Sequence, residues 1–186
     1  MSRLALAFAL TAALAPAAFA TEYTRMQPEQ SSIAFAYRQM GVSMDGRFKS
    51  FAGQLSFDPA QPDKARAVLD VDLASIDTGS AENDDEVAGK DWFDTAAFPK
   101  AHFEASTVKA LGGERYEVTG KLSIKGVSRE VQVPATFSAQ NGVGVFAGSF
   151  TLRRGDYAIG QGEWAAFDVV ANEIQVSFRL VAQAGQ

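Results

Sequence analysis

The single histidine is the first residue to test for acid–base or nucleophilic chemistry. His102 stands alone, and the chain has no cysteine. A serine triad would need His102, yet no G-x-S-x-G sequence accompanies it. One histidine is too few for a histidine-based metal site. The lack of cysteine excludes disulfides and thiolate sites. His102 alternates with apolar Phe103, so we expect it on the outer, polar face of a strand. We predict no catalytic residue, no metal and no cofactor.

A run of acidic residues is the second group that could do chemistry. Asn83-Asp84-Asp85-Glu86, with Asp91 and Asp94 beyond it, could suggest calcium. The run lacks the spacing and the central glycine of an EF-hand loop. We interpret it as the solvated face of a helix. A carboxylate-pair glycosidase stays open, because such carboxylates meet in space. No glycine-rich phosphate loop opens a helix.

The charge balance limits the partners of the chain. Its net charge is −5, and no cluster of basic residues interrupts the acidic composition. Proteins that bind nucleic acid carry a basic patch. We therefore predict no nucleic-acid binding and no docking on anionic lipid by charge alone.

The first twenty residues read as a secretion signal. Arg3 supplies a positive start, residues 4–14 are apolar, and Ala18-Phe19-Ala20 has the form of a cleavage site. The apolar stretch is short for a membrane span, which takes about 20 residues. We predict cleavage after Ala20, no stable membrane insertion, a location in the bacterial periplasm or outside the cell, and one domain over residues 21–186.

The elements that must position any site are short strands. Between Tyr116 and Ile124, large apolar residues alternate with polar ones, which is the period of a half-buried strand. The same alternation recurs along the chain, with a single polar, acidic segment that predicts a helix at about residues 80–91. Asn141-Gly142 marks a tight hairpin. We predict an all-β fold, an extended antiparallel up-and-down barrel of about eight strands with one short helix.

A barrel of this size is either solid or hollow. About eight strands enclose either a side-chain core or one small ligand. Phenylalanines on the apolar faces would fill a dry core. Small residues on the same faces, Gly53, Ala105, Gly120 and Ala135, either leave room along the barrel axis or pack within a tapered core. The pattern alone leaves both interpretations open.

Several short blocks occur in an order that resembles the YceI-like family of periplasmic, polyisoprenoid-binding proteins. The resemblance runs from about Tyr23 to Val181. The blocks are Ser32-Ile33-Ala34-Phe35, Gly46-Arg47-Phe48, Phe51-Ala52-Gly53, Phe57-Asp58-Pro59, Ser75-Ile76-Asp77-Thr78-Gly79, Trp92-Phe93-Asp94, Phe98-Pro99-Lys100-Ala101-His102-Phe103 and Gly120-Lys121-Leu122-Ser123-Ile124-Lys125-Gly126-Val127.

The resemblance implies a lipocalin-like barrel with an apolar tunnel that binds a long isoprenoid lipid, such as a polyprenyl phosphate or a quinone, without catalysis. Trp92 and Phe93 are candidates for the tunnel mouth or lid, or for a staple of the helix onto the barrel. The chain departs from the family where many members carry histidine, reading Glu29-Gln30-Ser31 and Arg38-Gln39-Met40 there. The residues that the resemblance implies as tunnel lining are Ile33, Phe35, Tyr37, Phe48, Leu55, Phe57, Leu69, Val71, Trp92, Phe93, Phe98, Phe103, Val118, Leu122, Phe137, Ile174, Val176 and Phe178.

Two other functions share these features. An outer-membrane barrel has the same alternation and signal, with the apolar face turned outward. An enzyme of isoprenoid or quinone metabolism would need a polar cluster at the tunnel mouth, for which Arg47, Asp91 and Arg154 are candidates; they are also our head-group candidates. We further expect a homodimer on the ground that strand exteriors such as Val108 are apolar.

Overall fold

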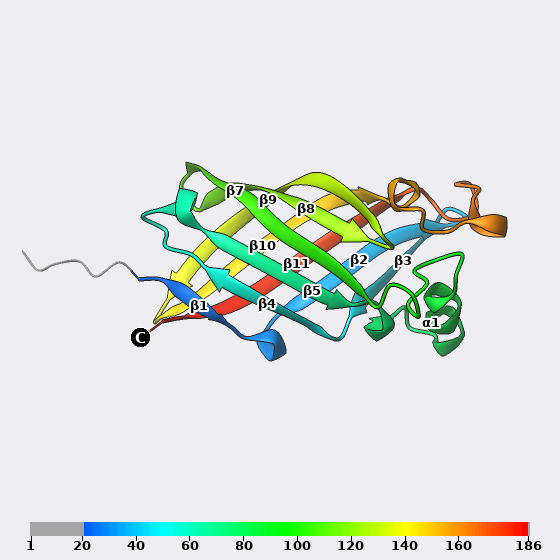
Figure 1. Cartoon of the computed structure of the whole chain (residues 1–186), viewed down its shortest axis with the longest axis horizontal. Coiled ribbons are helices and arrows are strands. Elements are labelled where there is room, and N and C mark those ends of the chain that lie inside the picture. Colours follow the sequence, from blue (N-terminus) through cyan, green and yellow to red (C-terminus); the bar gives the residue numbers. More distant parts are fainter. Residues whose placement is uncertain (1–20, 186) are drawn as a thin grey trace, which may run out of the picture.

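One curled antiparallel sheet of eleven strands makes up most of the protein (Figure 1). The computed structural model describes residues 21–185, so the predicted signal peptide lies outside the described residues. The all-β, lipocalin-like class is confirmed, with more strands than the sequence predicts. The strands are β1 (Tyr23–Met26), β2 (Ser32–Gln39), β3 (Val42–Phe48), β4 (Phe51–Ser56), β5 (Arg66–Asp72), β6 (Ile76–Asp77), β7 (Lys100–Gly112), β8 (Arg115–Ile124), β9 (Val127–Gln140), β10 (Val143–Arg153) and β11 (Glu173–Ala184).

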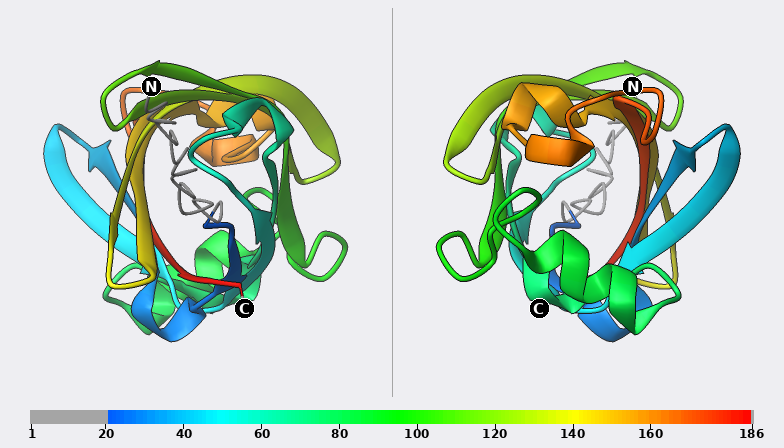
Figure 2. Two further views of the ribbon diagram at one scale, coloured as in Figure 1. Left: turned by 90° about the vertical axis from the view of Figure 1, so that its left-hand side faces the viewer. Right: turned by 90° about the vertical axis from the view of Figure 1, so that its right-hand side faces the viewer.

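The strand order is that of an up-and-down barrel. It runs β4-β5-β7-β8-β9-β10-β11-β2-β3-β6, and β1 pairs with β11. Tyr23 of β1 also exchanges two backbone hydrogen bonds with Phe57, at 2.8 and 3.1 Å, just beyond the end of β4. Strand β1 therefore connects the edge at β4 to β11, and the sheet curls into the tube seen end-on in Figure 2.

Strand β3 follows β2 after a two-residue turn. Met40 and Gly41 both have positive φ, 49° and 80°, as a two-residue hairpin turn requires. The chain therefore returns at once and pairs with β2. A Cβ on Gly46 would lie within 3 Å of the Phe35 ring, so a glycine is needed where that ring crosses β3.

The helix is shorter than predicted. Helix α1 spans Ala81–Ala88 and ends at Gly89, a residue that disfavours helix. The Asp84 carboxylate accepts hydrogen bonds from the Thr78 backbone N–H at 2.8 Å and the Thr78 hydroxyl at 2.7 Å, which fixes α1 to the preceding segment. No helix among residues 21–185 is long and apolar enough to cross a bilayer. The short 3-10 helices are η1 (Pro28–Gln30), η2 (Pro62–Lys64), η3 (Leu73–Ser75), η4 (Arg154–Tyr157) and η5 (Gly162–Trp164).

The two ends of the barrel differ. At one end, aromatic side chains form a solid plug, with centroid distances of 4.6 to 5.0 Å between neighbouring rings. The plug residues are Tyr23, Phe57, Phe137 and Phe146. At the other end lie α1 and the loop that carries η4 and η5 (Figure 2). A second buried cluster, which includes Leu73, Trp92 and Tyr157, packs there.

A β-bulge corrects the expectation about Val108. The register of β7 against β8 shifts between Ala105 and Thr107, so one extra residue reverses the alternation beyond it. Val108 consequently faces the interior and is 8% exposed. The apolar strand exterior on which the homodimer was predicted is therefore absent at this position.

Candidate functional site

An apolar cavity of about 330 Å³ runs inside the sheet, from the aromatic plug to α1. This volume lies in the range of small-molecule sites. All but two of the residues predicted to line a tunnel lie on its wall. The predicted residues found there are Ile33, Phe35, Tyr37, Phe48, Leu55, Phe57, Leu69, Val71, Trp92, Phe93, Phe103, Val118, Leu122, Ile174, Val176 and Phe178.

Phe98 and Phe137 do not line the cavity. Phe98 covers the turn between β8 and β9, where a Cβ on Gly126 would lie 3.0 Å from its ring. Phe137 is buried in the plug, 5.0 Å from the Tyr23 ring and 4.8 Å from the Phe57 ring. Both residues were predicted to line the cavity because they are apolar. Residue type does not reveal which contacts each ring makes.

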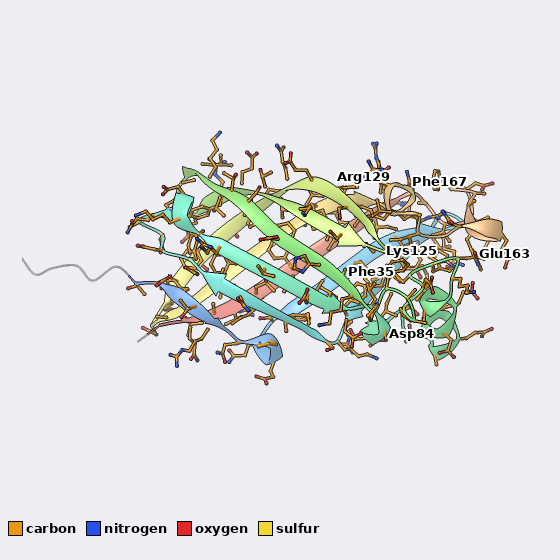
Figure 3. All side chains as sticks on the ribbon, viewed as in Figure 1. Phe35, Asp84, Lys125, Arg129, Glu163 and Phe167 are labelled. Atoms are coloured by element: carbon orange, nitrogen blue, oxygen red, sulfur yellow. The ribbon has the colours of Figure 1, made fainter. Side chains whose placement is uncertain are left out.

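Register brings apolar residues of neighbouring strands together on the inner face. Val176 of β11 stands opposite Phe35 of β2 on one side and Phe150 of β10 on the other; Figure 3 labels Phe35. The alternate residues of β11, such as Ser177 and Arg179, are exposed. The apolar face thus turns inward, the reverse of an outer-membrane barrel, whose apolar band faces lipid.

Of the two roles that the pattern left open for the small residues, Gly53 and Gly120 have the packing role. A Cβ on Gly120 would lie 2.5 Å from the Phe103 ring, and one on Gly53 would lie 2.6 Å from the Val68 carbonyl oxygen. Gly120 therefore lets an aromatic ring lie flat on the sheet, and Gly53 lets a backbone approach closely. Neither glycine leaves an empty space.

Several wall residues escaped prediction. Phe150 and Leu152 of β10 line the cavity, and the period-two pattern of that strand would have found them. Val87 of α1 and Trp164 of η5 also line it. These two lie outside the strands, and no periodicity in the sequence marks them.

Polar and indole side chains line the cavity where it meets α1 and the η5 loop. We call this group the rim: Gln39, Thr78, Asn83, Glu86 and Trp164. Trp164 Nε1 donates a 2.8 Å hydrogen bond to Glu86 Oε1, and the Trp164 ring lies 5.6 Å from the Trp92 ring. The rim therefore joins α1 to the η5 loop, two segments far apart in the sequence.

Arg154, one of the three head-group candidates, lies on the cavity wall, and its guanidinium is bonded to the protein backbone. It is 1% exposed, and burial lowers the pKa of its guanidinium from the ordinary value. All three guanidinium nitrogens donate hydrogen bonds of 2.7 to 3.3 Å to backbone carbonyls. Arg154 thus holds the η4–η5 loop in place and has no donor nitrogen without a protein partner. The accepting carbonyls belong to Ile159, Gly160, Trp164, Ala166, Val170 and Ala171.

Arg47 and Asp91, unlike Arg154, do not line the cavity. Arg47 is 67% exposed on the outside and pairs with Asp77 at 3.0 Å. Hydrogen bonds from Gly79 and Arg47 lower the pKa of the Asp77 carboxyl. The backbone carbonyl of Asp91 accepts from Gln161 at 2.7 Å. The polar cluster that an enzyme of this kind would need is therefore not assembled from the three candidates.

Lys125 and His102 also have structural partners. Lys125 Nζ donates to the carbonyls of Lys90 at 2.7 Å and Ala158 at 2.9 Å, tying the segment after α1 to the η4 loop. Burial lowers the pKa of Lys125, while the nearby carboxylates of Asp94 and Asp91 oppose this. On the outer face, His102 Nδ1 lies 2.7 Å from Asp70 Oδ1 across β5 and β7.

Fold and cavity together define a class, the antiparallel barrels with an apolar interior. The chain belongs to the YceI-like family, because the YceI-like domain model matches residues 25–182. A UPF0312 protein of Pseudomonas savastanoi pv. phaseolicola is 33% identical over 166 residues, covering 82% of this chain and 85% of that protein.

Solved structures show the same fold. The crystal structure of Burkholderia cenocepacia BcnA has 39% sequence identity and a TM-score of 0.83, covering 85% of this chain and 99% of that one. A polyisoprenoid binding domain from Saccharophagus degradans, implicated in plant cell wall breakdown, has 18% identity and a TM-score of 0.68, covering 88% of this chain and 98% of that one. At this identity the second likeness shows the fold alone.

Proposed function

We propose that this protein binds a long isoprenoid lipid in its cavity and carries or stores it, without catalysis. The observation that carries the proposal is the cavity wall, which is apolar from the plug to the rim. Family membership supports it, as does the fold shared with a polyisoprenoid binding domain. We further propose that residues 1–20 are a signal peptide cleaved after Ala20 and that the protein works in the periplasm.

The energetics of such a site need no directional chemistry along the lipid tail. Burying one methylene group is worth about 0.8 kcal/mol. A few isoprene units therefore supply enough free energy to hold the chain, once the loss of motion on binding is subtracted. Aromatic rings such as Phe35, Phe103 and Phe150 can contact a branched, unsaturated tail at any position along the wall.

Native mass spectrometry of the full-length product, purified from the envelope of its host without detergent, tests the proposal. We expect protein ions that carry a lipid, released on activation and identified by its isoprenoid fragment series. Delipidated protein should regain the adduct when mixed with a lipid extract. Ions that match only the bare polypeptide, both before and after mixing, would refute the proposal.

A further inference from the structure

Trp92 carries a buried hydrogen-bond donor without a partner. The residue is 8% exposed and lies on the cavity wall. Its indole Nε1 is the one buried side-chain donor or acceptor within residues 21–185 that no other described group satisfies. Leaving a buried donor without a hydrogen bond costs about 1–3 kcal/mol. A native protein therefore keeps such a donor where another molecule accepts its hydrogen bond.

The two side chains that pack against the Trp92 ring, Arg154 and Trp164, offer it only donors. The Arg154 guanidinium carbon lies 5.5 Å from the ring centroid, and a guanidinium has no acceptor. The Trp164 indole likewise has only a donor, which it gives to Glu86. A molecule inside the cavity can supply the acceptor that these two side chains lack.

The charges at this end set the kind of acceptor. Helix α1 carries Glu82, Asp84, Asp85 and Glu86, and Glu163 lies on the η5 loop. Figure 3 shows Asp84 and Glu163 at the same end of the barrel. Three cations at this end are engaged, since Arg154 and Lys125 donate to backbone carbonyls and Arg47 pairs with Asp77.

An anionic head group at the rim would meet the like charges of α1, and Arg154, Lys125 and Arg47 are already bonded to other groups. An uncharged oxygen meets no such repulsion. It can also accept the one donor that the wall leaves unused.

We propose that the cavity selects an apolar chain that ends in an uncharged hydrogen-bond acceptor, such as a carbonyl oxygen, which binds Trp92 Nε1, and that it disfavours phosphate heads. This inference rests on the proposed lipid-binding function. Because Nε1 is enclosed, a neighbouring side chain has to shift when the oxygen enters. Trp164 is that neighbour, since one hydrogen bond to Glu86 holds its indole on a loop.

Three probes that share a farnesyl chain separate the head from the tail: farnesene, farnesylacetone and farnesyl monophosphate. The chain has two tryptophans, both at this end of the barrel, so intrinsic fluorescence reports binding there. One net hydrogen bond is worth about 0.5–1.5 kcal/mol. We expect the ketone to bind about 2- to 10-fold more tightly than the hydrocarbon, and the phosphate to bind more weakly than either at low salt.

Substituted proteins test which residues set the preference for an uncharged, hydrogen-bonding head. Trp92→Phe should abolish the advantage of the ketone, so that farnesylacetone and farnesene bind the variant with dissociation constants within about 2-fold of each other. Glu82→Gln with Asp85→Asn should strengthen phosphate binding. Glu104→Gln with Glu117→Gln, which removes the same charge from the outer wall, should not.

Indole NMR decides the question in the unaltered protein, in case a variant does not fold. Of the two indole N–H signals, assigned with Trp164→Phe, that of Trp92 should move downfield with the ketone and with neither of the other probes. Equal affinity for ketone and hydrocarbon, an unmoved Trp92 signal or tightest binding of the phosphate would overturn the inference while lipid binding stands. Failure of farnesene and both other probes to bind would instead refute the proposed function.

Discussion

At the scale of single residues, close contacts decide where this barrel is filled. The Phe103 ring lies against β8 because Gly120 has no side chain there. Arg154 organises a whole loop because its planar group reaches six carbonyls at once. A single substitution can test the importance of each of these contacts for stability.

Gly120→Ala should destabilise the protein. The new methyl group would lie 2.5 Å from the Phe103 ring and 2.7 Å from the Glu104 carbonyl oxygen, and backbone cannot yield cheaply. We expect a loss of about 1–3 kcal/mol in the free energy of unfolding, measured with urea. Gly185→Ala is the control, because its methyl group would meet only a hydroxyl at 3.1 Å. Equal urea concentrations at the midpoint of unfolding for the two variants would contradict the close packing of Phe103.

Arg154→Met should loosen the η4–η5 loop. Methionine has a similar length but no donors, so the carbonyls that Arg154 now satisfies lose their partner. We expect a loss of about 3 kcal/mol or more and faster amide exchange over residues 155–171. Arg153→Met at the neighbouring residue is the control. Arg153 is exposed, and its Nη2 lies 3.7 Å from Glu173 Oε1. This substitution should change the free energy of unfolding by at most about 1 kcal/mol. A wild-type exchange pattern in Arg154→Met would rule out this role.

At the scale of elements, the rim is built by segments that the sheet does not contain. Helix α1 follows the two-residue strand β6, and the η5 loop follows β10. One side-chain hydrogen bond, between Trp164 and Glu86, joins them. The bulge in β7 similarly decides which residues face inward, because one extra residue reverses the alternation.

Trp164→Phe should separate the two sides of the rim. The ring keeps most of its apolar contact with Trp92 but loses the donor to Glu86. We expect about 2- to 10-fold faster hydrogen exchange in α1 and η5, corresponding to a net hydrogen bond of about 0.5–1.5 kcal/mol. Glu163→Gln, one residue away and exposed, serves as the comparison and should leave exchange unchanged. Indistinguishable exchange in the two variants would show that the hydrogen bond does not restrain the rim.

At the scale of the whole molecule, one sheet separates an apolar interior from a polar exterior. The plug fills one end with aromatic rings, and the cavity occupies the rest. The solid and hollow interpretations that the pattern left open both apply, each to a different part of the barrel. A ligand that enters can therefore extend only as far as the plug.

Val176→Trp should block lipid binding with little effect on folding. The new indole would occupy the cavity between the rows of Phe35 and Phe150. We expect at least about a 10-fold weaker affinity for farnesene, corresponding to 1.4 kcal/mol, measured by fluorescence. Ser177→Trp places the same indole on the outer face of β11 and should bind normally. Undiminished binding by the folded Val176→Trp protein would place the tail elsewhere.

The sequence by itself determined the all-β class, because the period of two assigns each strand residue to a face before any partner is known. The order of its motif blocks determined the family and most of the cavity wall. It did not determine the reversed alternation at Val108, the loop-holding role of Arg154 or the rim. These depend on contacts such as that of Trp164 with Glu86, 78 residues apart in the chain. Only the tertiary structure could decide them, since chain curvature and strand register select which distant side chains meet.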